Sequence, residues 1–162
     1  MGKKHSVDSS IKPPEKKSQV SYEFFTLGST HPTQIQLLQA AYMKNPSLLI
    51  DFYHKGLDLN TNLNPEGWKI IHVACQTGNK DLTNFLVSKK ADLNPVEYTQ
   101  HWTPLMVAVF NNNVEIVSLL LLHNVDCLKT DKEGKTALAY ALQYDNTKIF
   151  NILNSKHLTL YR

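Results

Sequence analysis

The chain has 162 residues, of which 42% are apolar and 9% aromatic, and its formal net charge at pH 7 is +3. This composition suits a globular domain and excludes a chain that is disordered throughout. No apolar run approaches the roughly 20 residues of a membrane-spanning helix, and the basic start lacks the apolar core of a secretory signal. We therefore expect a cytoplasmic protein whose cysteines, Cys75 and Cys127, are reduced thiols.

Residues 1–20 differ from the rest of the chain. Five lysines against one aspartate and one glutamate give this segment a formal charge of +3, so residues 21–162 balance to zero. The segment has no apolar periodicity and cannot bury enough surface to offset the entropy of ordering. It is expected to be a flexible basic tail.

Three roles are open for this tail. The simplest is a solubilising segment. The start Met1-Gly2-Lys3-Lys4-His5-Ser6 also fits the pattern for N-myristoylation of Gly2. The lysines would then supply the second signal that one acyl chain needs, giving weak membrane association through residues 2–17. Nucleic-acid binding is not expected, because lysines without arginine or interleaved aromatics make a poor reading surface.

Apolar residues return at positions 22–27, ahead of the first predicted helix. They predict a cap helix or strap over the open end of that helix. Thr33 stands where an N-cap would, and an apolar face then runs from Ile35 to Tyr42. A break around Pro46 ends this helix, and residues 48–53 predict its partner.

Three further helix starts follow at a nearly constant period. In the clearest, Thr103 can cap the helix and Pro104 suits the first helical position, where no amide hydrogen is needed. A large apolar residue followed three positions later by alanine recurs at steps of 34, 34 and 33 residues. The four pairs are Leu37/Ala40, Ile71/Ala74, Leu105/Ala108 and Leu138/Ala141.

A second apolar run follows each of the last three starts, separated from the alanine by seven residues. Its i, i+3, i+4 spacing predicts another short helix with one buried stripe. The exits from the second helices carry Gly56, Lys90 and Asn124. Glycine and asparagine suit a left-handed helix stop, and lysine suits it less well.

Together these features resemble the ankyrin repeat, which combines a turn, a Thr-Pro-Leu-His helix start, an alanine, a glycine, a leucine-rich second helix and a Gly-Ala-Asp-x-Asn tail. The resemblance covers about three quarters of the chain. It implies an all-α fold, an ankyrin-repeat solenoid of helix-turn-helix units with protruding hairpin-like turns. The implied ankyrin-repeat domain spans 21–162, with a degenerate capping repeat at 31–60 and repeats at 64–94, 97–128 and 131–157.

The chain departs from the family pattern at several helix starts. Lys69 and Ile70 replace Thr-Pro, which predicts a weaker cap. The motif histidine is present as His72, whereas Met106 and Ala139 stand at its place in the next two repeats. Those two repeats therefore lack the polar side chain that in the family braces the neighbouring turn.

The turns and the C-terminal end also depart from the pattern. The unequal steps imply one extra residue in each of the turns before Lys69 and Thr103. His101 occupies the place of the turn glycine, which predicts either an altered turn or strain absorbed by the extra residue. The apolar residues at 158–161 are expected to fold over the last repeat as a cap, with a free end as the alternative.

No arrangement typical of catalysis occurs in the sequence. The seven histidines are dispersed, and no phosphate loop, nucleophile elbow or metal-ligand cluster is found. His72 and Cys75 stand three residues apart but make no zinc site without a second pair. We expect no enzymatic activity, no metal and no cofactor.

The resemblance implies protein binding on a concave face built from the turns and the first helices. The first expectation is a monomeric adaptor or inhibitor. The alternative is a secreted or membrane-directed effector, similar to ankyrin proteins of intracellular bacteria, whose repeats select a host target and whose tail sets location. A regulatory fragment of a larger assembly is the third. The contact positions carried over by register are Tyr42, Met43, Glu66, Trp68, Gln76, Thr77, Gln100, Trp102, Phe110, Asn111, Glu133, Lys135, Gln143 and Tyr144.

Large side chains are frequent among these positions, and aromatic residues often dominate binding interfaces. Phe110 and Tyr144 are expected at the partner surface. For Trp68 and Trp102 two roles stay open, contact with a partner or packing against the adjacent turn.

Overall fold

The computed structural model describes residues 33–43, 46–123 and 125–160. Within these ranges the secondary structure is helical apart from two isolated β-bridges, Asn62 with Lys69 and Thr130 with Thr136. The helices are α1 (Gln34–Tyr42), α2 (Ser47–His54), α3 (Ile70–Thr77), α4 (Lys80–Ser88), α5 (Pro104–Phe110), α6 (Val114–Leu122), α7 (Ala137–Gln143) and α8 (Thr147–Leu160).

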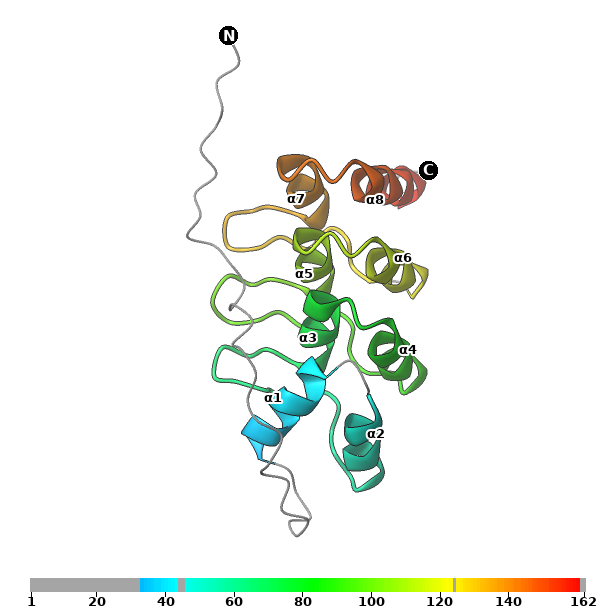
Figure 1. Ribbon diagram of the computed structural model, residues 1–162. Helices are drawn as coiled ribbons and strands as arrows, with labels where there is room; N and C mark the ends of the chain where they lie inside the picture. Colours follow the sequence, from blue (N-terminus) through cyan, green and yellow to red (C-terminus); the bar gives the residue numbers. More distant parts are fainter. Residues whose placement is uncertain (1–32, 44–45, 124, 161–162) are drawn as a thin grey trace.

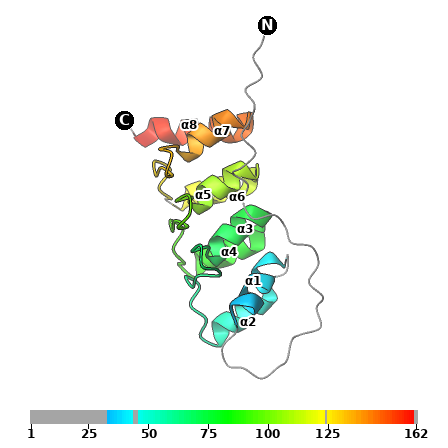
Figure 2. The same cartoon turned by 90° about the vertical axis from the view of Figure 1, so that its left-hand side faces the viewer.

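The helices form four pairs that stack in chain order, from α1/α2 at one end to α7/α8 at the other (Figure 1). The odd-numbered first helices make one row and the even-numbered second helices make a second row beside it. Hairpin-like turns project from the first-helix row (Figure 1), and the view of Figure 2 shows them along one edge of the stack. We call the turns at 63–68, 97–102 and 131–135 the three fingers.

Threonine hydroxyls cap three of the four first helices. The Thr33, Thr103 and Thr136 hydroxyls accept hydrogen bonds from backbone N–H groups three residues later, at 3.3, 3.2 and 3.3 Å. The Lys69 side chain has no hydrogen-bond acceptor, so it cannot cap α3 as the threonines cap their helices. Instead, Nδ1 of His72 accepts the Lys69 N–H at 3.1 Å, so the family histidine satisfies part of this helix start.

The repeated apolar-alanine pairs lie in the interior, as their period predicts, except that Leu138 of the last pair is half-buried. Leu37, Ile71 and Leu105 are buried, and the four alanines of these pairs are fully buried. Because alanine has a single methyl group, it allows adjacent first helices to approach closely. Both cysteines are also buried and free, and burial raises the pKa of the Cys75 thiol.

Three asparagines join neighbouring repeats, a feature that the sequence analysis missed. The side-chain amides of Asn79, Asn113 and Asn146 donate to the Met43, Cys75 and Val109 carbonyls of the preceding repeat, at 3.1, 2.6 and 2.9 Å. Each asparagine immediately precedes a second helix. Their spacing of 34 and 33 residues was the available sequence signal.

Backbone hydrogen bonds close the fingers and confirm where the extra residues lie. Each finger is closed by a bond from its first N–H to its last carbonyl, and the first two fingers are one residue longer than the third. The bonds run from Leu63 to Trp68 at 2.6 Å, from Glu97 to Trp102 at 3.1 Å and from Asp131 to Lys135 at 3.0 Å. Successive fingers are also joined, since the Tyr98 N–H donates to the Glu66 carbonyl and the Lys132 N–H donates to the Gln100 carbonyl.

Of the two alternatives for His101, the altered turn is not observed. The φ of 61° at His101 matches the left-handed conformation of Gly67 and Gly134, with φ of 80° and 74°. The finger therefore keeps the conformation of a turn glycine and holds a non-glycine residue in it, at a cost of about 1 kcal/mol. Lys90, with φ of 57°, takes the same left-handed conformation as Gly56 at a second-helix exit, as expected.

Gly67→Ala is expected to destabilise the fold more than Gly134→Ala. Both glycines have positive φ, but a Cβ on Gly67 would lie 2.7 Å from the Tyr98 ring, whereas a Cβ on Gly134 has open space within 4 Å. We expect about 1 kcal/mol for Gly134→Ala from the backbone alone, and a further 1–3 kcal/mol, roughly, for Gly67→Ala from overpacking. Urea unfolding measures both. Equal losses, or an excess that persists when Tyr98 is also changed to alanine, would contradict the proposed clash.

The described C-terminal residues, which end at Leu160, do not fold back as expected. Helix α8 continues to Leu160, and the Leu158 side chain is 59% exposed, so the cap expected from residues 158–161 is wrong for Leu158. The expected strap at 22–27, the tail at 1–20 with Gly2, and Tyr161 lie outside the described residues. In the part of the chain that is described, no helix is both long enough and apolar enough to cross a bilayer.

Candidate protein-binding surface

The fourteen expected contact positions all lie on the fingers or at the C-terminal ends of the first helices. We call this surface the finger surface. Three of the positions are buried, namely Trp68, Gln76 and Trp102. Eight are half-buried: Tyr42, Met43, Thr77, Gln100, Phe110, Asn111, Lys135 and Tyr144. Three are exposed: Glu66, Glu133 and Gln143.

Both tryptophans pack inside the molecule. Trp68 is 6% exposed and Trp102 is 4% exposed. The Trp68 ring lies 5.4 Å from the His72 ring, and the Trp102 ring lies 5.1 Å from Phe110 and 5.2 Å from Tyr140. Of their two open roles, the structure favours packing over partner contact, but the aromatic contacts are with residues of the first helices and not with the adjacent turn.

Trp102, Phe110, Tyr140 and Tyr144 form an aromatic cluster that spans two repeats. Phe110 meets Tyr144 edge to face at 5.1 Å, and Tyr140 and Tyr144 are stacked at 6.0 Å. Trp102 and Tyr140 are buried, whereas Phe110 and Tyr144 remain half-buried. Two rings of the cluster are therefore fixed in the interior, and the edges of the other two lie on the finger surface.

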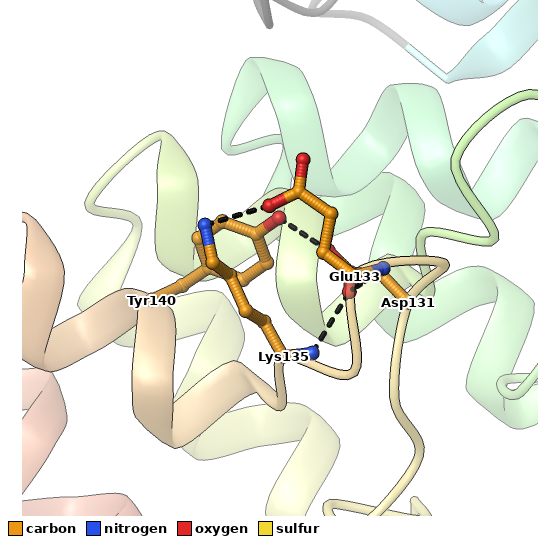
Figure 3. A network of polar contacts seen from close by, with 4 residues as sticks. All are labelled: Asp131, Glu133, Lys135 and Tyr140. Atoms are coloured by element: carbon orange, nitrogen blue, oxygen red, sulfur yellow. Dashed lines mark hydrogen bonds and ion pairs between the residues drawn. The ribbon is translucent and has the colours of Figure 1, made fainter. Parts of the chain in front are cut away.

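Asp131 fixes the third finger (Figure 3). The Tyr140 hydroxyl donates to Oδ2 of Asp131, while Oδ1 accepts the Glu133 and Lys135 N–H groups at 2.9 and 2.8 Å. Burial raises the pKa of Tyr140, and its bond to Asp131 raises it further, so the phenol stays neutral.

Lys135 and Glu133 place a paired charge beside the aromatic cluster (Figure 3). Nζ of Lys135 lies 2.8 Å from Glu133 and 5.7 Å from the centre of the Tyr140 ring. The hydrogen bond to Glu133 raises the pKa of Lys135. This part of the finger surface therefore presents the Lys135 ammonium group and the Glu133 carboxylate as a salt bridge.

Glu97 binds backbone N–H groups of the second finger, as Asp131 does in the third. Its carboxylate accepts the Thr99, Gln100 and Trp102 N–H groups at 2.7, 2.6 and 3.0 Å. Burial alone would raise the pKa of Glu97, but the hydrogen bonds, first among them one from the Thr99 hydroxyl, lower it below the ordinary value. The sequence analysis missed both acids, although each stands at the start of a finger.

His72 connects two repeats behind this surface. With Nδ1 accepting the Lys69 N–H, the proton lies on Nε2, which donates to the Trp102 carbonyl at 3.3 Å. The ring is fully buried. Burial is the main cause that lowers its pKa to about 4, so it is neutral at physiological pH.

The finger surface offers ring edges, amides and paired charges, which are groups suited to contact with another protein. Throughout the described residues, His, Cys, Asp and Glu side chains nowhere gather in a group of three that could hold a metal ion.

Stacked helix pairs with joined fingers define a class of solenoid repeat protein. The chain belongs to the ankyrin-repeat family: the family model for ankyrin repeats in three copies matches residues 37–131 and 96–160.

Several ankyrin-repeat proteins are similar in sequence. An ankyrin repeat protein of Acanthamoeba polyphaga mimivirus is 24% identical over 124 residues, which are 76% of this chain and 16% of that protein. Ankyrin repeat and SAM domain-containing protein 6 of Rattus norvegicus is 35% identical over 95 residues, 57% of this chain and 11% of that protein. The NF-kappa-B inhibitor cactus of Drosophila melanogaster is 31% identical over 98 residues, 57% of this chain and 19% of cactus. The chain thus spans less than a fifth of each of these relatives.

Proposed function

We propose that this chain is a non-enzymatic adaptor or inhibitor that holds a protein partner on its finger surface. Ankyrin repeats are typical protein-interaction modules, and one relative is named as an inhibitor. The observation that carries the proposal is a row of side-chain pairs at the first-helix ends, one pair in each repeat. The pairs are Tyr42/Met43, Gln76/Thr77, Phe110/Asn111 and Gln143/Tyr144.

The hydrogen bonds of the fingers support this proposal, because they hold the surface in one conformation. Glu97 and Asp131 each bind several backbone N–H groups within a finger, and the fingers are joined to one another. At the row itself, the Tyr42 hydroxyl donates to Oε1 of Gln76 at 2.7 Å, linking two repeats. A surface held in this way loses little conformational entropy on binding.

Phe110→Ala and Tyr144→Ala are each expected to weaken partner binding by about 2 kcal/mol, or roughly 30-fold in Kd. Their ring edges supply the broad apolar contact area of the finger surface. The measurement is affinity capture from a cell lysate with identification of the retained proteins, followed by a titration with the main one. Leu122→Ala is the matched control, since Leu122 is 78% exposed on α6 in the second-helix row.

The aromatic cluster could be loosened by these changes, so Gln143→Arg provides a second variant at an exposed position. It adds bulk to the finger surface without removing a packed ring. Circular dichroism checks that each variant keeps its helices. Unchanged binding in all three variants, or equal loss in Leu122→Ala, would overturn the proposal.

A second proposal is an effector whose repeats select a host target and whose tail sets location. The observation that favours it is that all of the net positive charge lies in residues 1–20. Under this proposal, deletion of residues 2–20 relocates the protein, and mass spectrometry of protein made in a eukaryotic cell finds Gly2 acylated. Under the first proposal the protein stays cytoplasmic, and the deletion leaves both location and partner binding unchanged.

A further inference from the structure

Tyr98 of the second finger is an exposed aromatic residue whose ring is held in place. Its side chain is 56% exposed, and it is not among the fourteen expected contact positions. The ring packs so closely on Gly67 of the first finger that a Cβ there would lie 2.7 Å from it. The Tyr98 hydroxyl accepts a hydrogen bond from Nδ2 of Asn62 at 3.0 Å. A ring that is already fixed loses little entropy when a partner covers it.

Both neighbouring fingers also hold the Tyr98 backbone. Its N–H donates to the Glu66 carbonyl at 2.7 Å, and its carbonyl accepts a hydrogen bond from Nζ of Lys132 at 3.2 Å. Asn64 and Lys132 stand at the place of Tyr98 in the first and third fingers. The exposed ring at this place is therefore a property of the second finger.

His101 is a second exposed side chain of the same finger. The Glu97 carboxylate binds the N–H groups on both sides of it, at Gln100 and Trp102, and so fixes the backbone around it. Among the described residues the His101 side chain makes no hydrogen bond, ion pair or ring contact. Its left-handed conformation is therefore not offset by any contact of its imidazole.

This conformation is costly for histidine, and glycine stands at its place in the other two fingers. Asn112 and Asp145 also have positive φ, but Asn and Asp adopt this conformation more readily. Lys90 has the same property at a second-helix exit, away from the finger surface. Strained residues are typical of functional sites, and His101 is the one of these two costly residues that lies on the finger surface, in the same finger as Tyr98.

Both side chains offer a hydrogen-bond donor that no described residue accepts. The Tyr98 hydroxyl oxygen is used by Asn62, but its own proton has no acceptor in the described part of the chain. The imidazole of His101 carries at least one N–H group. Oxygen acceptors, such as those of carbonyl and carboxylate groups, would satisfy both donors.

We propose that Tyr98 and His101 are specificity-determining residues of the finger surface, which donate hydrogen bonds to oxygen acceptors on the protein partner. This role rests on the proposed function and places the second finger inside the interface. Histidine at position 101 strengthens binding and weakens the fold, because glycine would form the same turn without strain.

The first test of this role needs no partner. His101→Gly should raise the midpoint of thermal unfolding of the full chain by about 2–4 °C, because it relieves the strained backbone. Lys90→Gly is the matched control and should raise the midpoint by a similar amount. Circular dichroism measures both. An unchanged or lower midpoint for His101→Gly would overturn the proposal, because histidine would then not be kept at a cost to stability.

The second test is a titration, with the main protein retained by the wild-type chain in affinity capture as the probe. His101→Gly and Tyr98→Phe should each raise Kd by about tenfold, whereas Lys90→Gly should leave it unchanged. Tyr98→Phe keeps the ring on Gly67 and removes the O–H donor. His101→Asn lacks the imidazole without gaining the flexibility of glycine, so it should also raise Kd by about tenfold. Wild-type affinity in His101→Asn would overturn the role of the imidazole.

The same titration distinguishes this role from the proposed function. If Phe110→Ala and Tyr144→Ala weaken binding while Tyr98→Phe and His101→Gly do not, the role of the second finger is wrong and the proposed function stands. If none of the four changes weakens binding, both are wrong.

Discussion

Trp102→Ala is expected to lower the free energy of unfolding by about 4 kcal/mol, as for other large-to-alanine changes in a core. The indole is 4% exposed and its ring packs against Phe110 and Tyr140. Removing it would open a cavity between two repeats and break the aromatic cluster. Urea unfolding followed by circular dichroism measures the loss.

Trp68→Ala provides the matched comparison, because Trp68 holds the same place in the first finger and its ring contacts only the His72 ring among the described aromatic side chains. Aromatic pairs contribute about 0.5–1.5 kcal/mol each beyond their burial. Trp68→Ala should therefore cost less by roughly one such contact, about 0.5–1.5 kcal/mol. A loss below about 1 kcal/mol for Trp102→Ala would show that the cluster does not stabilise the stack.

The second large effect is a loss of stability in mild acid that depends on His72. The folded protein lowers the pKa of His72 to about 4, against an ordinary value of about 6.5 in the unfolded chain. The unfolded state therefore binds the proton first as pH falls. The stabilisation is complete above about pH 6.5 and is lost progressively toward pH 4, by up to about 3 kcal/mol.

His72→Met should remove this pH dependence, and it is a reasonable replacement because Met106 holds the same place in the next repeat. At neutral pH the variant should be less stable than wild type, since it lacks the bonds to Lys69 and Trp102. Free energies of unfolding at several values between pH 7 and pH 4 make the comparison. Glu97, whose pKa is also lowered in the fold, is present in both proteins, and its charge is one of the influences that raise the pKa of His72 in the wild type. Parallel curves for the two proteins would contradict this role of His72.

The repeat architecture could be predicted from the sequence because each repeat buries the same side of its first helix. Ile71 and Leu105 show this directly, since each is followed by a fully buried alanine at a fixed distance. The caps at Thr33 and Thr103 and the longer first two fingers were also predicted correctly. A period maintained through several units constrains the fold more strongly than any single motif does.

Contacts between repeats could not be predicted in the same way. The two tryptophans stand at contact positions of the family, and only packing against Phe110, Tyr140 and His72 shows that they are interior residues. The left-handed conformation of His101 depends on the finger around it, which overrides the preference of the residue.

Hydrogen–deuterium exchange of the chain, alone and with the partner retained in affinity capture, tests the proposed function most directly. Protection on binding should be concentrated in the fingers at 63–68, 97–102 and 131–135 and at the C-terminal ends of α3, α5 and α7. Protection confined to α2, α4 and α6, with unchanged exchange in the fingers, would contradict it.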